Sequence, residues 1–328
     1  MNRGKFYMEQ TNAKNVFSRI GFAQVAGTVA SAIVGRLIIM PLVTESNIEK
    51  TFETVGSSGL LLMIYVPQIA YLLAYWLFVR PMSVMDWQKE SLGFKTIAKI
   101  FLMMYFVTSV INQIGAAITK TAPAGGSTQL DILAKMQTTK LPVGIMIPVI
   151  IGPVLEELIF RKLMLDRTRG YGEKTAVIFS SICFGLFHGN LTQFLYATCA
   201  GLFLGYVYCK TGKVLHTMLM HMLLNATSSA ILLVLPVLEN LHSNGAVISI
   251  IGLGLVVILF AAMSISGLVL LIRWIKGKKF QFDESLPELI PQGEVLKTVY
   301  LNPGVIILFA IQIFGIVADL FNLNIQLK

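Results

Sequence analysis

GPVLEELIFRKLM, residues 152–164, places two adjacent glutamates, Glu156 and Glu157, inside a long apolar stretch. Charged groups are rare in membrane helices because burying one costs roughly 2.5–3.5 kcal/mol for Asp, Lys or Arg on insertion scales. Each of these carboxylates therefore needs a partner, a chemical role, or both. The composition of the chain indicates which environment surrounds them.

That environment is a lipid bilayer. The chain has 328 residues, of which 55% are hydrophobic and only 13% are charged, with a mean hydropathy of +0.73. A water-soluble domain carries about 25% charged residues, and a membrane span needs about 20 apolar ones. The sequence therefore predicts an all-α, polytopic integral membrane bundle of about 8–9 transmembrane helices. The candidate spans are 18–43, 57–79, 97–118, 141–160, 175–189, 191–209, 214–236, 246–272 and 302–324.

The distribution of charge predicts an orientation. The net charge is +9, and lysine and arginine collect in the N-terminal tail and in alternate loops. In a membrane protein this pattern reflects the positive-inside bias, so we expect a cytoplasmic N-terminus and no nucleic-acid partner. The economical loops favour a multi-pass protein of a bacterial cell membrane. The three cysteines all fall in or beside predicted spans, which indicates packing rather than a disulfide framework.

Three motifs with helical spacing lie within residues 156–225. In the first, Glu157 and Arg161 are four residues apart, so they share a helix face and can form an ion pair. Glu156 then points about 100° away and is free to face the bundle interior. Pro148, Gly152 and Pro153 lie just upstream and predict a kink there.

The other two motifs each add one polar position per span. Phe184 and His188 share one helix face, and so do His221 and Asn225. If these spans are neighbours, Glu156, His188, His221 and Asn225 come together.

Such a set of four side chains suits hydrolysis of a peptide bond. A carboxylate in an apolar pocket can take a proton from water, and a histidine beside it can pass that proton to the leaving amine. A second histidine and an asparagine amide can stabilise an oxyanion. Alternatively, Glu156, His188 and His221 could hold zinc and leave a position open for water. The spacing leaves both mechanisms open, although the HExxH motif of common zinc proteases is absent.

The ordered motifs EExxxR, FxxxH and HxxxN resemble those of the CPBP family of intramembrane proteases, which includes the CaaX prenyl proteases and the bacteriocin-processing (Abi) proteins. The resemblance covers about residues 156–225. It implies that Glu156 activates water with His188 as its partner, and that His221 and Asn225 stabilise the oxyanion. Glu157, Arg161 and Phe184 would be supporting residues. A metal-free glutamate mechanism is slightly favoured over a zinc mechanism.

The sequence therefore predicts a membrane peptidase in three parts. N-terminal spans (1–140) and C-terminal spans (237–328) flank a catalytic core (141–236). The expected substrate is a membrane-associated peptide or protein, such as a peptide pheromone, a bacteriocin precursor or a membrane-protein segment. Two rival hypotheses remain. One is a non-catalytic immunity or scaffold protein, and the other is a proton-coupled transporter.

Overall fold

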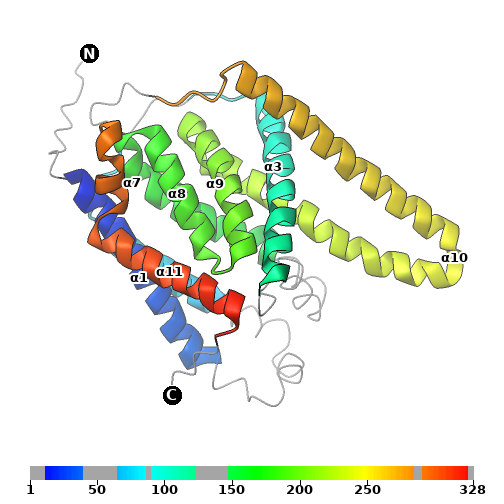
Figure 1. Ribbon diagram of the computed structural model, residues 1–328, viewed down its shortest axis with the longest axis horizontal. Coiled ribbons are helices and arrows are strands. Elements are labelled where there is room, and N and C mark those ends of the chain that lie inside the picture. The colour runs from blue at the N-terminus through cyan, green and yellow to red at the C-terminus, as the bar shows by residue number, and fades with distance from the viewer. Residues whose placement is uncertain (1–11, 40–64, 86–89, 123–146, 284–289, 324–328) are drawn as a thin grey trace.

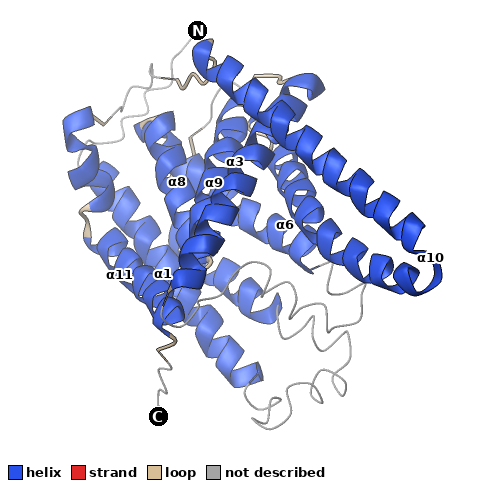
Figure 2. Ribbon diagram, turned by 45° about the vertical axis from the view of Figure 1, so that its right-hand side comes forward, coloured by secondary structure: helices blue, strands red, loops and turns tan. Residues whose placement is uncertain are grey.

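The computed structural model describes residues 12–39, 65–85, 90–122, 147–283 and 290–323, and every regular element within them is a helix (Figures 1 and 2). This confirms the all-α prediction for the described part of the chain. The elements are α1 (Asn12–Ile39), an unlabelled helix (Tyr65–Val79), α3 (Phe94–Thr121), η1 (Ile147–Ile151), α6 (Gly152–Glu157), η2 (Leu158–Leu165), α7 (Asp166–Thr168), η3 (Arg169–Tyr171), α8 (Glu173–Phe187), α9 (Leu191–Thr211), α10 (Val214–Lys276), η4 (Gln292–Glu294), η5 (Leu296–Tyr300) and α11 (Pro303–Phe321).

The helices have the length and apolarity of membrane spans. Among the described residues, four helical segments are long and apolar enough to cross a bilayer, namely Ala13–Leu37, Phe94–Thr121, Ile250–Lys276 and Pro303–Phe321. The helix Tyr65–Val79 is apolar but shorter, and the first part of its predicted span, 57–64, lies outside the described residues. The chain is thus a multi-pass helical membrane protein.

Helices α8 and α9 form the centre of the bundle and pack antiparallel through glycines. A Cβ atom on Gly185 of α8 would lie 2.1 Å from the Thr198 hydroxyl of α9. A Cβ atom on Gly201 of α9 would lie 2.9 Å from the Cα of Ser181. Small residues let helix backbones approach closely in a membrane, where packing replaces the hydrophobic effect between helices. The pair therefore holds the polar side chains of both helices in a fixed register.

Two hydrophobic clusters flank this pair. One joins α8 to α1, to the helix Tyr65–Val79 and to α11. On that side α1 and α11 run next to one another (Figure 1), and the Gly304 N–H donates to the Ser18 hydroxyl at 3.1 Å. The other cluster joins α9 to α3 and to the C-terminal part of α10. The central helices are thereby enclosed on both sides.

Helix α10 differs from the prediction. We expected separate spans at 214–236 and 246–272, whereas the backbone stays helical from Val214 to Lys276. Figure 1 shows two arms of α10 that meet at a bend, the second arm returning beside α3. Pro236, Asn244 and Gly245 disfavour a helix interior, so the sequence favours a loop where the backbone remains helical. The first arm reaches the region of η1 and α6, where the candidate site lies.

Candidate active site

The segment in which we predicted a kink contains π-helix. Residues Ile147–Ile151 form η1, directly before the α-helical turn that carries both glutamates. In a π-helix the carbonyl of residue i accepts from the N–H of residue i+5. For Pro148 that residue is Pro153, which has no N–H. The Asn225 amide of α10 donates to the Pro148 carbonyl instead, at 2.8 Å.

This contact makes Asn225 a positioning residue for η1. Replacing Asn225 with Ala leaves a part-buried carbonyl without its donor, so we expect the free energy of unfolding to fall by about 1–3 kcal/mol. Adding Pro153→Ala restores a backbone N–H, so it should recover part of that loss. Chemical unfolding of both variants in mixed micelles measures the effect. Equal destabilisation by Asn225→Ala with and without Pro153→Ala would contradict this role.

The ion pair predicted from spacing is confirmed. Arg161 Nε lies 3.0 Å from Glu157 Oε2, and both side chains are fully buried. Arg161 also donates to the Ser180 hydroxyl at 3.1 Å, and its guanidinium lies 5.3 Å from the centre of the Phe184 ring. The Ser180 hydroxyl in turn donates to the Phe160 carbonyl at 2.9 Å. Glu157 is therefore a neutralised structural carboxylate that ties the η2 segment to α8.

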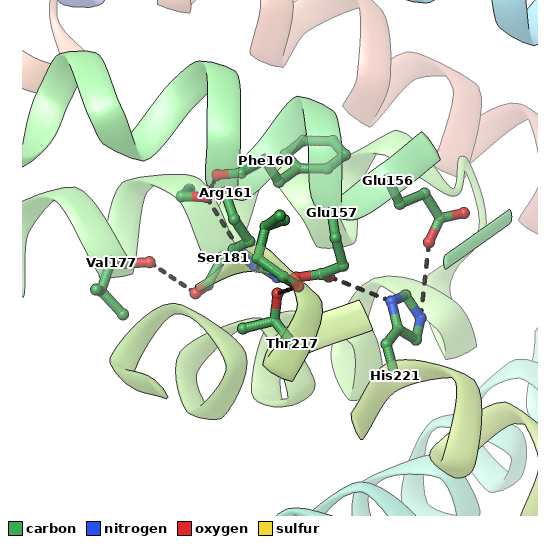
Figure 3. A network of polar contacts seen from close by, with 10 residues as sticks. Glu156, Glu157, Phe160, Arg161, Val177, Ser181, Thr217 and His221 are labelled. Carbon is green, nitrogen blue, oxygen red and sulfur yellow. Dashed lines mark hydrogen bonds and ion pairs between the residues drawn. The ribbon is translucent and has the colours of Figure 1, made fainter. Parts of the chain in front are cut away.

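His221 lies between the two glutamates (Figure 3). Its Nδ1 is 3.2 Å from Glu157 Oε1, and its Nε2 is 3.7 Å from Glu156 Oε2. Because an ionised carboxylate can only accept hydrogen bonds, the ring proton belongs on Nδ1. The Thr217 hydroxyl, one turn before His221, also hydrogen-bonds Glu157. Glu156, with 16% of its side chain exposed, has no basic side chain other than histidine against it among the described residues.

His188 is presented at the end of α8 by a tight connection to α9. It is the C-cap of α8, and the next residue, Gly189, has φ +68°, a left-handed conformation that favours glycine. Asn190 then caps α9 by accepting from the Gln193 N–H at 2.9 Å, and its amide donates to the His188 carbonyl at 3.2 Å. The His188 backbone is thus held from both sides.

Phe184 links the two histidines. The centre of its ring lies 5.2 Å from that of His188 and 5.6 Å from that of His221. His188 is within Coulombic range of both Glu156 and His221. The structure therefore brings together Glu156, Glu157, Arg161, Phe184, His188 and His221, all of which the sequence singled out. Asn225 lies one turn beyond His221 on α10 and binds the backbone at Pro148.

The structure also adds residues that the sequence reasoning missed. Ser180 lies four residues before Phe184, and Thr217 lies four residues before His221. Each therefore shares a helix face with a residue of the predicted motifs. The signal was present as two rows with a spacing of four residues, Ser180–Phe184–His188 and Thr217–His221–Asn225. Neither hydroxyl is unusual enough in a membrane helix to be selected without the tertiary contacts.

The zinc alternative requires three converging ligands. Within the residues that the structure describes, no group of three His, Cys, Asp or Glu side chains has a metal-binding arrangement. The contact of His221 Nδ1 with Glu157 leaves Nε2 as the nitrogen that could act as a ligand. Because Glu156, His188 and His221 do not form such a group as arranged, we derive no step through a metal.

Fold and site together define a multi-pass helical membrane protein with a buried cluster of carboxylates, imidazoles and one guanidinium. Residues 138–227 match the family model described as type II CAAX prenyl endopeptidase Rce1-like. The chain is also similar to a Bacillus subtilis (strain 168) protein named "Putative membrane peptidase YdiL", with 28% identity over 146 residues. That match covers 42% of this chain and 57% of the relative. No solved structure matches the chain.

These two matches support the resemblance of residues 156–225 to the CPBP family of intramembrane proteases. The matched segment contains every motif on which the resemblance was based. The chain spans little more than half the length of the curated relative it matches.

Proposed function

We propose that the protein is an intramembrane endopeptidase that hydrolyses a peptide bond of a membrane-associated peptide or protein. One observation carries the proposal. Of two adjacent carboxylates, Glu157 is fully buried and bound by Arg161, whereas Glu156 is partly exposed and, among the described residues, has His221 as its ion-pair partner. Glu156 is therefore the carboxylate available to accept a proton from water. The match of residues 138–227 to a family model of endopeptidases supports the same class of reaction, peptide-bond hydrolysis.

In the proposed reaction Glu156 takes one proton from a water molecule as the water oxygen attacks the scissile carbonyl carbon. The tetrahedral intermediate carries its negative charge on the former carbonyl oxygen. When the C–N bond breaks, the leaving nitrogen receives the proton from Glu156, with His188 as the partner that relays it. The products are one carboxylic acid and one amine, and Glu156 returns to its ionised form.

His221 and Asn225 are the proposed oxyanion donors, and their contacts limit how they can act. With Nδ1–H directed at Glu157, His221 can donate from Nε2 only in its doubly protonated form. The Asn225 amide has two N–H bonds, one of which is directed at Pro148, so the second is the one available to an oxyanion. Each residue thus combines a structural contact with one remaining donor.

The mechanism is proposed to be metal-free. Because the donor set is organised for hydrogen bonding, we expect that a zinc chelator leaves the rate of cleavage unchanged. The measurement compares initial rates of the purified protein with and without chelator, followed by readdition of zinc. Loss of cleavage on chelation and recovery with zinc would instead make Glu156, His188 and His221 metal ligands.

The proposed setting is a bacterial cell membrane with the N-terminus in the cytoplasm. The proposed substrate is a peptide pheromone, a bacteriocin precursor or a segment of a membrane protein.

To test the proposed function, the reconstituted protein is incubated with a library of membrane-tethered peptides, in parallel with the Glu156→Gln and His188→Ala variants. Cleavage by the unchanged protein that both substitutions abolish would support the proposal. No cleavage, with both variants still complementing a deletion strain, would favour a scaffold, and flux driven by a pH gradient would favour a transporter.

A further inference from the structure

A second candidate site lies at the opposite end of α8 from His188. An apolar groove of about 310 Å³ runs between α8, α9 and the segment that follows α10. Lys174 stands at its rim, fourteen residues before His188. At a rise of about 1.5 Å per residue, the two are about 21 Å apart along the helix. The groove is therefore separate from the candidate active site. Its lining is Lys174, Val177, Ile178, Leu202, Phe203, Tyr206, Phe280 and Phe282.

The walls of the groove are ordered by aromatic and hydrogen-bonding contacts. The rings of Tyr206 and Phe280 meet edge to face at 5.3 Å, and those of Tyr206 and Phe282 at 5.6 Å. The Tyr206 hydroxyl donates to the Lys279 carbonyl at 3.2 Å, which ties the segment after α10 to α9. The groove is thus a packed feature of the fold, with an apolar wall suited to a hydrocarbon chain.

Positive charge gathers at the same end. Beside the exposed Lys174, the end of α10 and the turn after it contain the exposed lysines Lys276, Lys278 and Lys279. Two of the described acidic groups nearby are paired. Glu173 pairs with Arg169 and accepts the Asp283 N–H at 2.6 Å. Glu90 pairs with Lys210 at 3.1 Å. Asp283 adds one further negative charge, so among the described residues the lysines at this end outnumber the carboxylates that remain.

We propose that this groove binds an anionic phospholipid, with an acyl chain along the apolar wall and the headgroup phosphate on Lys174. A chain of methylenes fits the apolar lining, and a basic cluster beside a membrane helix attracts anionic lipid headgroups. The groove lies on α8, the helix that carries Phe184 and His188. Lipid occupancy therefore stabilises the element on which half of the candidate active site is built.

The test uses the full chain, purified in detergent, stripped of lipid and then mixed with phosphatidylglycerol or phosphatidylcholine of matched acyl chains. Native mass spectrometry counts the lipids retained. We expect phosphatidylglycerol to be retained preferentially, and Lys174→Gln to weaken its retention by about tenfold, as for loss of one charge-assisted contact. Lys213→Gln, an exposed lysine at the start of α10, is the matched control and should have no such effect.

A second pair of variants tests the apolar wall. Leu202→Trp fills the groove and should also lower retention, whereas Leu219→Trp alters an exposed leucine outside it and should not. Equal retention of the two lipids, or the same result for Lys174→Gln and Lys213→Gln, would overturn the proposal. Equally tight binding of glycerol phosphate alone would show a phosphate site and make the acyl-chain assignment wrong. These readouts do not depend on cleavage.

Discussion

Replacing Glu156 with Gln is expected to lower the rate of peptide cleavage by about 10²–10⁴-fold, the contribution of a general base. The amide keeps the shape of the side chain but cannot accept the proton of the attacking water. Because Glu156 is partly exposed and, in the described part of the chain, its ion-pair contact is His221 at 3.7 Å, the substitution should leave the fold intact. Initial rates on a verified substrate, measured beside the unfolding midpoint of each protein, check both statements.

The matched control for this prediction is Glu294→Gln. Glu294 is an exposed glutamate of η4, outside the cluster around His221. The Glu294→Gln protein should cleave the substrate at the same rate as the unchanged protein. A Glu156→Gln protein that also cleaves at the unchanged rate would contradict the proposed role of Glu156. If Glu156→Gln loses activity only because it unfolds, the unfolding midpoint will reveal it.

Replacing Arg161 with Met is expected to lower the free energy of unfolding by about 3–5 kcal/mol, because it leaves the Glu157 carboxylate buried without its cation. Both side chains of this pair are fully buried, and Arg161 also binds Ser180. Unfolding in mixed micelles measures the change. Adding Glu157→Leu removes the uncompensated charge, so the double variant should recover part of the lost stability.

The neighbouring residue supplies the control. Lys162 forms an ion pair with Asp166 at 2.7 Å, but 54% of the lysine side chain is exposed. Asp166 is buried, but it also accepts a hydrogen bond from the Tyr208 hydroxyl at 2.7 Å, so we expect Lys162→Met to be less destabilising than Arg161→Met. The hypothesis fails if Arg161→Met is no more destabilising than Lys162→Met, or if the double variant is less stable than Arg161→Met alone.

The contacts that the sequence predicted correctly are local ones. Glu157 and Arg161 meet because residues four apart on one helix are neighbours whatever surrounds them. The prediction of a kink upstream of Glu156 follows from two prolines and a glycine within six residues, and this segment overlaps η1. Local chemistry could not predict the continuous helix of α10. A short polar stretch between apolar segments is compatible with a loop or with an uninterrupted helix.

Pairing across helices was only partly predictable. The sequence grouped Glu156 with His188 and set His221 beside Asn225 as a separate donor pair. In the structure His221 stands between both glutamates, and Asn225 reaches the Pro148 carbonyl. Glu157 and His221 are 64 positions apart in the chain. No spacing rule relates such residues, because the rotation and depth of α10 against α6 decide which ring nitrogen meets which carboxylate.

By itself, then, the sequence determined the membrane class, the helical architecture and the small set of polar side chains from which a site can be built. Apolar composition and the period of the helix are sufficient for that. The i,i+4 pairing of Glu157 with Arg161, which separates the roles of the two glutamates, was also within reach of the sequence. Only the tertiary structure decided that His221 contacts both glutamates and that Asn225 binds the Pro148 carbonyl. The physical reason is that the rotation and depth of α10 against α6 are set by packing between helices, which no local spacing rule contains.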